Sequence, residues 1–461
     1  MKRIIARRDR RFDGRFFFGV RTTKIYCRPI CPAQPKPDNI ILFRSATEAE
    51  NAGFRACRRC RPELAPGNKL LDGTLNTVSR ALAIIADHAD EDLDIEGLAE
   101  KLGVSDRHLR RLFHEHLGAS PIEILLTRRL HLAKQLLQCT NAPIADIAFA
   151  SGFQSLRRFN EVCKARFQLP PSKLRNNVSS RQADSVQLEL AVRPPYDWKQ
   201  VIGYLERHET FGIEQVKRGV YRRFVPERNA VGVVSVSYKK QDAALAVKLE
   251  NIPLTSIRSV LSGIRRLFDT DHDPASLPRT KAIASRGIRV PGAYDPFETA
   301  VSIVLSQLVS TEHARAKLKQ LVLRFGDCLD RTRECYRFPA PSTLEDAEIE
   351  AIGIPRARAS ALRGLAQAVA AGMVDFRIDT EAARSALSAI HGIGPWTSAM
   401  IAMRCFGDPD AFPSSDLVIG RALSEDLVPI DDWRSYRAYL SHCLWRDCKT
   451  GRAPSPERRR G

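Results

Sequence analysis

The sequence has no long apolar run, and it lacks an apolar segment near its start. No stretch of its 461 residues approaches the roughly 18 consecutive apolar residues that a membrane-spanning helix needs. The first residues, MKRI, lead into a basic segment and not into the apolar core of a secretory signal. We therefore expect a cytoplasmic protein that has no membrane partner.

Acidic residues are the minority among the charges. Asp and Glu number 53 against 72 Lys and Arg, which gives a formal net charge of +19. The excess is uneven, because residues 1–70 hold 17 basic and 6 acidic residues. A basic block of this kind favours nucleic acid as the partner. The hydrophobic content of 44% is enough to build cores, so the chain is not a disordered polycation.

Cysteine is present in an odd number, 11, so the thiols cannot all be paired as disulfides. Four of them form two short clips, Cys27-x3-Cys31 and Cys57-x2-Cys60, with 25 residues between the clips. In a reducing compartment this spacing is typical of one tetrahedral zinc site. Two disulfides, or four unrelated thiols, are the alternatives.

Changes in composition divide the chain into four segments. Pro and Gly residues interrupt it at 62–67, and a polar stretch at 176–184 marks a second linker. Alternating apolar residues predict strands at 186–190, 230–238 and 244–249, whereas the hydrophobic periodicity of the sequence before and after this region predicts helices. The expected fold is multidomain α+β: a small α/β domain at 1–70, an all-α domain at 74–176, a strand-rich α+β subdomain at 185–275 and an all-α domain at 280–450.

The residues around the cysteine clips resemble a known family. Residues 18–29 (FGVRTTKIYCRP) and 52–62 (AGFRACRRCRP) are similar to the amino-terminal domain of the Ada adaptive-response regulators. The resemblance implies that Cys27 accepts a methyl group from a DNA methylphosphotriester, with Cys31, Cys57 and Cys60 as further ligands of one Zn²⁺. Zinc keeps such thiols deprotonated, and methylating one of four thiolates reduces the negative charge of the site from −2 to −1. Affinity for DNA should then rise.

Two helix breaks in segment 74–176 look like a duplicated unit. The first break precedes a helix expected over 106–116, and the second precedes one expected over 154–167. A helical bundle with a basic, solvated face is the simpler interpretation. However, GF at 152–153, RFN at 158–160 and FQLPPS at 167–172 resemble the AraC-type DNA-binding domain. The resemblance implies binding to double-stranded promoter DNA, with RNA polymerase as a further partner. The candidates for base contacts are Arg107, Arg110, Gln154 and Arg157.

A Gly-x-Gly turn lies between two helical segments near the end of the chain. Gly392 and Gly394 belong to the sequence IHGIGPWT (390–397), and Asp416 follows Trp396 by twenty residues. Backbone N–H groups at such a turn can hold a DNA phosphate. An ordinary helix corner and a helix N-cap are the simpler interpretations of the turn and of Asp416.

Together the turn and the aspartate are similar to the helix-hairpin-helix glycosylases. With RPPYDW (193–198), RLFD (266–269) and SQLVS (306–310), the resemblance to AlkA-type 3-methyladenine glycosylases spans about residues 186–446, and it makes the strand-rich subdomain TBP-like. It implies that Asp416 stabilises the oxocarbenium-like sugar while an alkylated base leaves, or helps to orient the attacking water, and that Leu308 fills the space of the flipped base. The expected base pocket consists of Trp396, Tyr204, Met400 and Trp445.

Two absences refine this prediction. Relatives that cut the DNA backbone carry Lys where this chain has Trp396, so a monofunctional glycosylase is expected. Only Cys443 and Cys448 lie near the end, too few for an iron–sulfur cluster. The sequence therefore predicts a nucleoid-associated enzyme that senses and excises DNA alkylation. The alternative is a transcriptional activator whose last domain binds DNA without chemistry.

Overall fold

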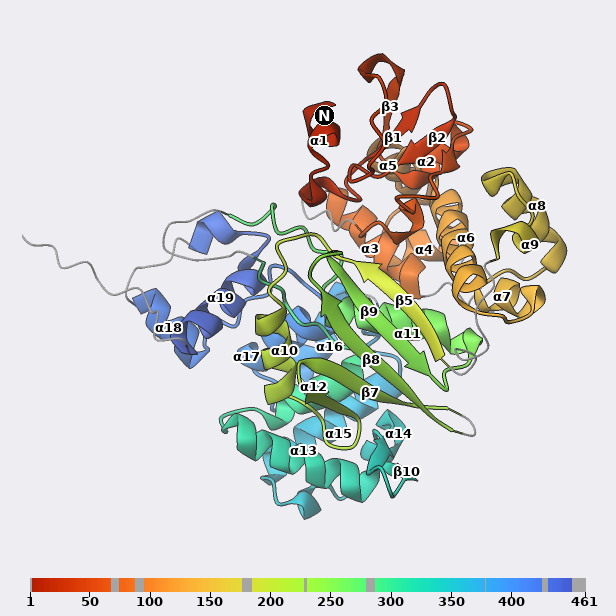
Figure 1. The fold of residues 1–461 in the computed structure, drawn as a ribbon. Coiled ribbons are helices and arrows are strands. Elements are labelled where there is room, and N and C mark those ends of the chain that lie inside the picture. The colour runs from red at the N-terminus through yellow and green to blue at the C-terminus, as the bar shows by residue number, and fades with distance from the viewer. Residues whose placement is uncertain are drawn as a thin grey trace, which may run out of the picture. The chain divides into compact units, whose positions relative to one another are not determined.

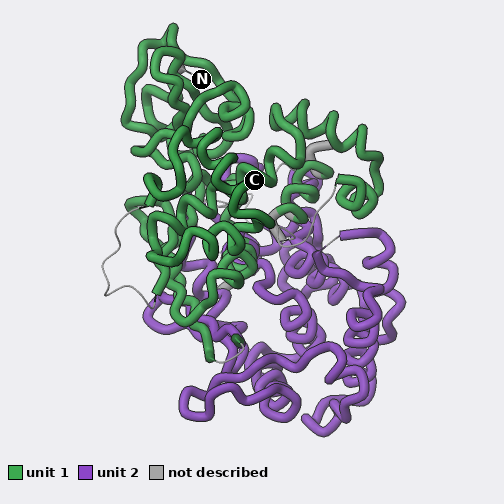
Figure 2. The backbone as a smooth tube through the Cα atoms, turned by 90° about the vertical axis from the view of Figure 1, so that its right-hand side faces the viewer, with its two compact units in different colours: residues 1–194, 227–265, 270–273 green, residues 195–226, 266–269, 274–461 purple. Residues whose placement is uncertain are grey.

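The computed structural model describes residues 2–67, 74–87, 95–175, 185–227, 230–278, 287–377, 379–424 and 430–449 (Figure 1). The chain forms two compact units, coloured separately in Figure 2. The first comprises residues 1–194, 227–265 and 270–273, and the second comprises 195–226, 266–269 and 274–461. Among the described helices, none is both long and apolar enough to cross a bilayer.

The amino-terminal part of the first unit is built on a small sheet of strand order β3-β1-β2-β4, in which β1 is antiparallel to β2 and β3, and β4 is parallel to β2. Gly19 in β1 lies against the rings of Phe43 and Phe54, whose centroids are 5.1 Å apart. A Cβ added at Gly19 would come within 2.7 Å of both rings, so only glycine fits there. The elements are α1 (Lys2–Arg7), η1 (Arg10–Phe12), β1 (Phe17–Val20), β2 (Ile25–Cys27), η2 (Pro37–Asn39), β3 (Ile40–Phe43), α2 (Ala46–Asn51), β4 (Arg55–Ala56) and η3 (Pro62–Leu64).

Helices follow, as the periodicity predicts. The helix expected over 106–116 ends one residue later, at Leu117, where Gly118 takes the left-handed conformation. The helix expected from residue 154 begins at Leu156, because the side chain of Ser155 caps it by accepting from the N–H of Arg158. The elements are α3 (Thr74–Asp87), α4 (Ile95–Lys101), α5 (Asp106–Leu117), α6 (Pro121–Cys139), α7 (Ile144–Ala150), α8 (Leu156–Phe167) and α9 (Pro171–Leu174).

A five-stranded sheet has the order β5-β9-β8-β7-β6. The three strands predicted from alternation are present as β5, β8 and β9, and Leu188 pairs with Val247 in the antiparallel register of β5 and β9. The alternation arises because every second residue faces the core. The elements are β5 (Ser185–Ala191), α10 (Trp198–Arg207), β6 (Glu214–Lys217), β7 (Val220–Pro226), β8 (Val231–Lys239), β9 (Ala244–Glu250) and α11 (Leu254–Leu267).

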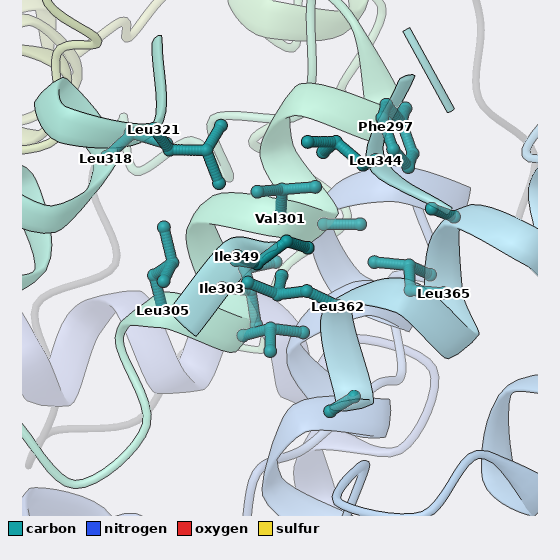
Figure 3. Packing of buried hydrophobic residues seen from close by; sticks show 14 of the residues in the cluster. Phe297, Val301, Ile303, Leu305, Leu318, Leu321, Leu344, Ile349, Leu362 and Leu365 are labelled. Atoms are coloured by element: carbon teal, nitrogen blue, oxygen red, sulfur yellow. The ribbon is translucent and has the colours of Figure 1, made fainter. Parts of the chain in front are cut away.

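The carboxyl-terminal part of the second unit is helical, with one short hairpin of β10 and β11. Its core joins Phe297 and Val301 to Leu362 and Leu365, which Figure 3 shows from close by. The elements are α12 (Pro296–Leu305), α13 (Thr311–Phe325), β10 (Asp327–Asp330), β11 (Cys335–Arg337), α14 (Pro341–Leu344), η5 (Ile349–Ile352), α15 (Arg356–Ala370), α16 (Glu381–Ala389), α17 (Pro395–Ile401), the π-helical η6 (Ala402–Phe406), α18 (Leu417–Ser424), η7 (Ile430–Trp433) and α19 (Arg437–Lys449).

Candidate functional site

The four cysteines of the two clips lie together in the first unit. Cys27 ends β2, and all four are buried, with Sγ atoms within 4.8 Å of one another. The Sγ atoms of Cys31 and Cys57 are 4.0 Å apart. Zinc–sulfur bonds of about 2.3 Å in a tetrahedron separate sulfurs by about 3.8 Å, so this donor set fits Zn²⁺. The four thiols hold one zinc ion.

The electrostatics of the cluster support this assignment. Contact with Cys31 raises the pKa of Cys27, whereas contact with Cys27 lowers the pKa of Cys57 and brings that of Cys31 to about 7. Contact with Cys27 also acts to lower the pKa of Cys60, but contacts with Cys31 and Cys57 and burial outweigh it, so that pKa is raised. Without a cation, four thiols this close cannot all ionise, because each thiolate repels the next. A divalent metal removes that repulsion.

Arg28 holds the two clips together. Its backbone N–H donates to Cys60 Sγ at 3.4 Å, and its guanidinium donates to the Cys60 carbonyl at 3.1 Å. The same guanidinium forms a buried ion pair with Asp13. Arg58 and Arg59, between the ligands of the second clip, are exposed. The metal site is therefore internally braced, while its outer turn presents cations to solvent.

The residues expected to contact bases are exposed on α5 and α8 or just before α8. Arg107 and Arg110 lie on α5, Gln154 precedes α8, and Arg157 lies on its first turn. Asp106 accepts from Arg110 at 2.8 Å, and Glu161 accepts from Arg157 at 3.0 Å. These pairs are solvent-exposed, so they are weak and can exchange for phosphate or base contacts.

Asp416 lies immediately before α18 and is partly exposed, beside a surface pocket of about 340 Å³. Its Oδ1 accepts from the backbone N–H groups of Val418 at 3.0 Å and Ile419 at 3.3 Å, so the N-cap interpretation is correct structurally. The carboxylate also accepts from two indoles: Trp445 Nε1 lies 3.0 Å from Oδ1, and Trp396 Nε1 lies 3.3 Å from Oδ2. The structure thus brings Trp396 and Trp445 to Asp416.

The other two expected pocket residues lie deeper. Tyr204 is buried and stacks on His208 with ring centroids 4.2 Å apart; its centroid is 5.2 Å from that of His442. Met400 is buried in the core cluster that includes Ile393. In the described part of the chain no side-chain hydrogen bond joins either of them to Asp416, so their place in a base pocket stays a prediction.

One glutamine, Gln307, joins the Gly-x-Gly turn to the loop that carries Leu308, the residue expected to fill the space of the flipped base. Gln307 Nε2 donates to the Gly392 carbonyl at 2.9 Å and to Thr397 Oγ1 at 2.7 Å. The next residue, Leu308, is fully exposed in the left-handed conformation, at a φ of 53°. The turn links α16 to α17, and a Cβ on Gly394 would meet nothing within 4 Å, so its backbone is open to a ligand.

Sequence reasoning did not assign a role to three residues of this site. Gln307 and Arg358, which donates to the Gln307 carbonyl at 2.6 Å, fix the loop that carries Leu308. His442 lies edge-on to Trp445, with centroids 5.1 Å apart. The only available signal for Gln307 was its place in the SQLVS segment, and nothing in the sequence pairs His442 with the carboxylate.

Comparison with known families gives three matches. The metal binding domain of Ada matches residues 1–63, a helix-turn-helix domain matches 98–177, and the AlkA N-terminal domain matches 187–295. These three matches follow the order expected from the sequence.

Three relatives extend the comparison. The "Probable bifunctional transcriptional activator/DNA repair enzyme AlkA" of Mycobacterium tuberculosis is 34% identical over 96% of this chain and 95% of its own length. The DNA-3-methyladenine glycosylase 2 of Escherichia coli is 30% identical over 55% of this chain and 94% of its own. The bifunctional transcriptional activator/DNA repair enzyme AdaA of Bacillus subtilis is 30% identical over 37% of this chain and 79% of its own.

Proposed function

The chain belongs to the family of bifunctional Ada/AlkA transcriptional activators and DNA repair enzymes, and on that premise we propose which of its residues carry the two activities. The protein accepts methyl groups on a zinc-bound cysteine, activates transcription and excises alkylated bases such as 3-methyladenine. Its macromolecular partner is DNA. The observation that carries the assignment of sites is that one chain holds both a buried cluster of four thiols and an aspartate bound by two indoles.

Cys27 is the proposed methyl acceptor. Bound zinc keeps the cysteines in the thiolate form at neutral pH. The sulfur of Cys27 forms a bond to the methyl carbon while the carbon–oxygen bond of the phosphotriester breaks, leaving an ordinary phosphodiester anion. Because the thioether is stable, each chain reacts once. The exposed Arg58 and Arg59 are positioned beside the ligands to bind the flanking phosphates.

Methylation is proposed to switch on sequence-specific binding by the two helix-turn-helix units. The loss of one negative charge weakens repulsion of phosphate by the metal site. Arg107, Arg110, Gln154 and Arg157 are then the proposed readers of the promoter. RNA polymerase is the proposed partner in activation, and the nucleoid in the cytoplasm is the proposed location.

Asp416 is the proposed catalytic carboxylate of base excision. An alkylated purine carries positive charge and leaves as a neutral base when its bond to C1′ breaks, and water adds to C1′ with loss of a proton. Asp416 stabilises the positive charge that develops on the sugar. Trp396 is the proposed stacking surface for the flipped base, Gly392 and Gly394 hold a phosphate, and Leu308 fills the vacated space. Since Trp396 replaces a Schiff-base lysine, the glycosylase is proposed to be monofunctional.

One experiment tests both sites. Duplex DNA carrying radiolabelled methyl groups is incubated with wild type, Cys27→Ser, Asp416→Asn and, as a control, the exposed Cys328→Ser. Wild type and the control should take up one label per chain and release free base. Cys27→Ser should lose the label alone, whereas Asp416→Asn should keep the label and release base roughly 100-fold or more slowly.

Three results would contradict these assignments. Label found by peptide mapping on another cysteine of wild type would exclude Cys27 as the acceptor, even if the serine variant fails to fold. Absence of base release by wild type would leave only the regulatory activity. Covalent trapping of the enzyme on DNA by borohydride would show that it cuts the backbone and is not monofunctional.

A further inference from the structure

Asp416 receives more hydrogen bonds than an N-cap needs. Two backbone N–H groups of α18 already satisfy Oδ1 in the way a capping aspartate is usually satisfied. The indole of Trp445, on α19, adds a third donor to Oδ1 at 3.0 Å, and the indole of Trp396, on α17, donates to Oδ2 at 3.3 Å. Side chains from two separate helices therefore hold a carboxylate whose capping role requires neither.

Trp445 is itself fixed from behind. His442, one helical turn earlier on α19, lies edge-on to its ring, and His442 Nδ1 is 3.4 Å from Gln200 Nε2 on α10. Tyr204 also contacts the imidazole, with ring centroids 5.2 Å apart. Since His442 and Tyr204 are both buried, the Trp445 ring has a packed support and a single polar partner among the contacts described.

We infer that Trp445 is a positioning residue, whose indole N–H fixes the orientation of the Asp416 carboxylate. The inference rests on the proposed role of Asp416 and refines it. A hydrogen bond to an ionised carboxylate is short and strong and restricts rotation of the group. A carboxylate held in one rotamer is already directed at the site where charge develops on the sugar, so no reorientation is needed during the reaction.

The two roles of Trp445 make opposite predictions for a phenylalanine. A stacking ring is preserved in Trp445→Phe and lost in Trp445→Ala, whereas the N–H donor is lost in both. Single-turnover release of 3-methyladenine is measured for both variants, together with their affinity for the same duplex. If Trp445 positions Asp416, both variants lose about ten-fold to one-hundred-fold in the rate of the chemical step, the equivalent of one charge-assisted hydrogen bond. Affinity for DNA is unchanged.

A matched control is available in the same unit. The indole of Trp198 donates to the Gly219 carbonyl at 3.2 Å and does not contact Asp416 in the described structure. Trp198→Phe should therefore retain the wild-type rate. If Trp445→Phe fails to fold, benzothienylalanine at position 445 replaces the N–H by sulfur in a ring of nearly the same shape, and it should give the same loss.

The outcomes separate this inference from the proposed function. A wild-type rate in Trp445→Phe or in the benzothienyl protein would overturn the inference and leave excision by Asp416 intact. A rise in KM with an unchanged rate of chemistry would also overturn it, because that result means the ring binds substrate. Failure of wild type itself to release base would overturn the proposed function and this inference with it.

Discussion

At the scale of single residues, Asp416 combines two tasks. Its Oδ1 caps α18, which fixes where the carboxylate lies, and its contacts with Trp396 and Trp445 fix how it is turned. Capping of α18 and the catalytic role proposed for Asp416 are thus compatible uses of one side chain.

His442 makes stability depend on pH. Burial, followed by the nearby Arg404, lowers the pKa of His442 to about 3. In the unfolded chain the imidazole has its ordinary pKa of about 6.5, so below that pH only the unfolded chain binds the proton. The free energy of unfolding therefore falls as the pH drops from about 6.5 towards 3.

Replacing His442 by a group that does not titrate tests this linkage. Between pH 6.5 and 4.5 the loss of unfolding free energy should be smaller in His442→Gln than in wild type by about 2–3 kcal/mol. Urea unfolding at the two pH values measures it. His313→Gln, at an exposed position, serves as the control and should follow wild type. Equal pH dependence in His442→Gln and wild type would contradict the prediction.

At the scale of elements, α6 is one of the helices against which the zinc-binding residues 1–67 pack within the first unit. Glu63 of η3 forms an ion pair with Lys134 of α6 at 2.9 Å, and both side chains are almost completely buried. Glu50 of α2 accepts from Tyr26 at 2.8 Å and contacts His131 of α6 at 3.2 Å. Buried charges of this kind stabilise only while both partners are present.

Removing one partner of the buried pair should therefore be costly. Lys134→Met leaves the Glu63 carboxylate buried without its lysine and should lower the free energy of unfolding by about 3–5 kcal/mol. Arg111→Met breaks the exposed pair with Glu115 and should change it by less than about 1 kcal/mol. Chemical denaturation of the zinc-loaded protein measures both. Similar effects of the two substitutions on the free energy of unfolding would show that the buried Glu63–Lys134 pair stabilises the fold no more than an exposed pair does.

At the scale of the whole molecule, the excess of positive charge favours binding to DNA, which is a polyanion. The net charge is +19, and residues 1–70 contribute a large share of it.

Arg193 links distant segments of the first unit, because its guanidinium donates to the carbonyls of Asp13 at 2.8 Å and Asp271 at 3.1 Å, and also to that of Gly67. Asp13 in turn pairs with Arg28, next to Cys27.

The salt dependence of DNA binding should show whether the basic residues near the metal site contact phosphates. Each phosphate contact contributes about −0.9 to the slope of log K against log salt concentration. The double variant Arg58→Ala, Arg59→Ala should therefore reduce the steepness by about 1.8 when duplex binding is titrated in salt. Arg377→Ala, whose guanidinium is paired with Asp375, is the comparison and should leave the slope unchanged. An unchanged slope in the double variant would exclude both arginines from phosphate contact.

Much of this organisation could be predicted because its signals are local. The cysteine spacing, the alternation in β5, β8 and β9, and the Gly-x-Gly turn depend on residues close together in the chain. The supports of the site could not be predicted in this way. Trp445 meets Asp416 across 29 residues, and Lys134 meets Glu63 across 71, so these contacts depend on tertiary packing that no short pattern encodes.

The fully exposed side chain of Leu308 has a consequence for how lesions are found. A leucine in water lacks roughly 1.5–3 kcal/mol of the stabilisation that burial would provide. In an intact, stacked duplex this side chain has no apolar space to enter. Where a weakened base pair opens, the leucine can be buried between the neighbouring bases. In the role proposed for Leu308, burial of this one side chain would therefore favour binding at base pairs that open easily.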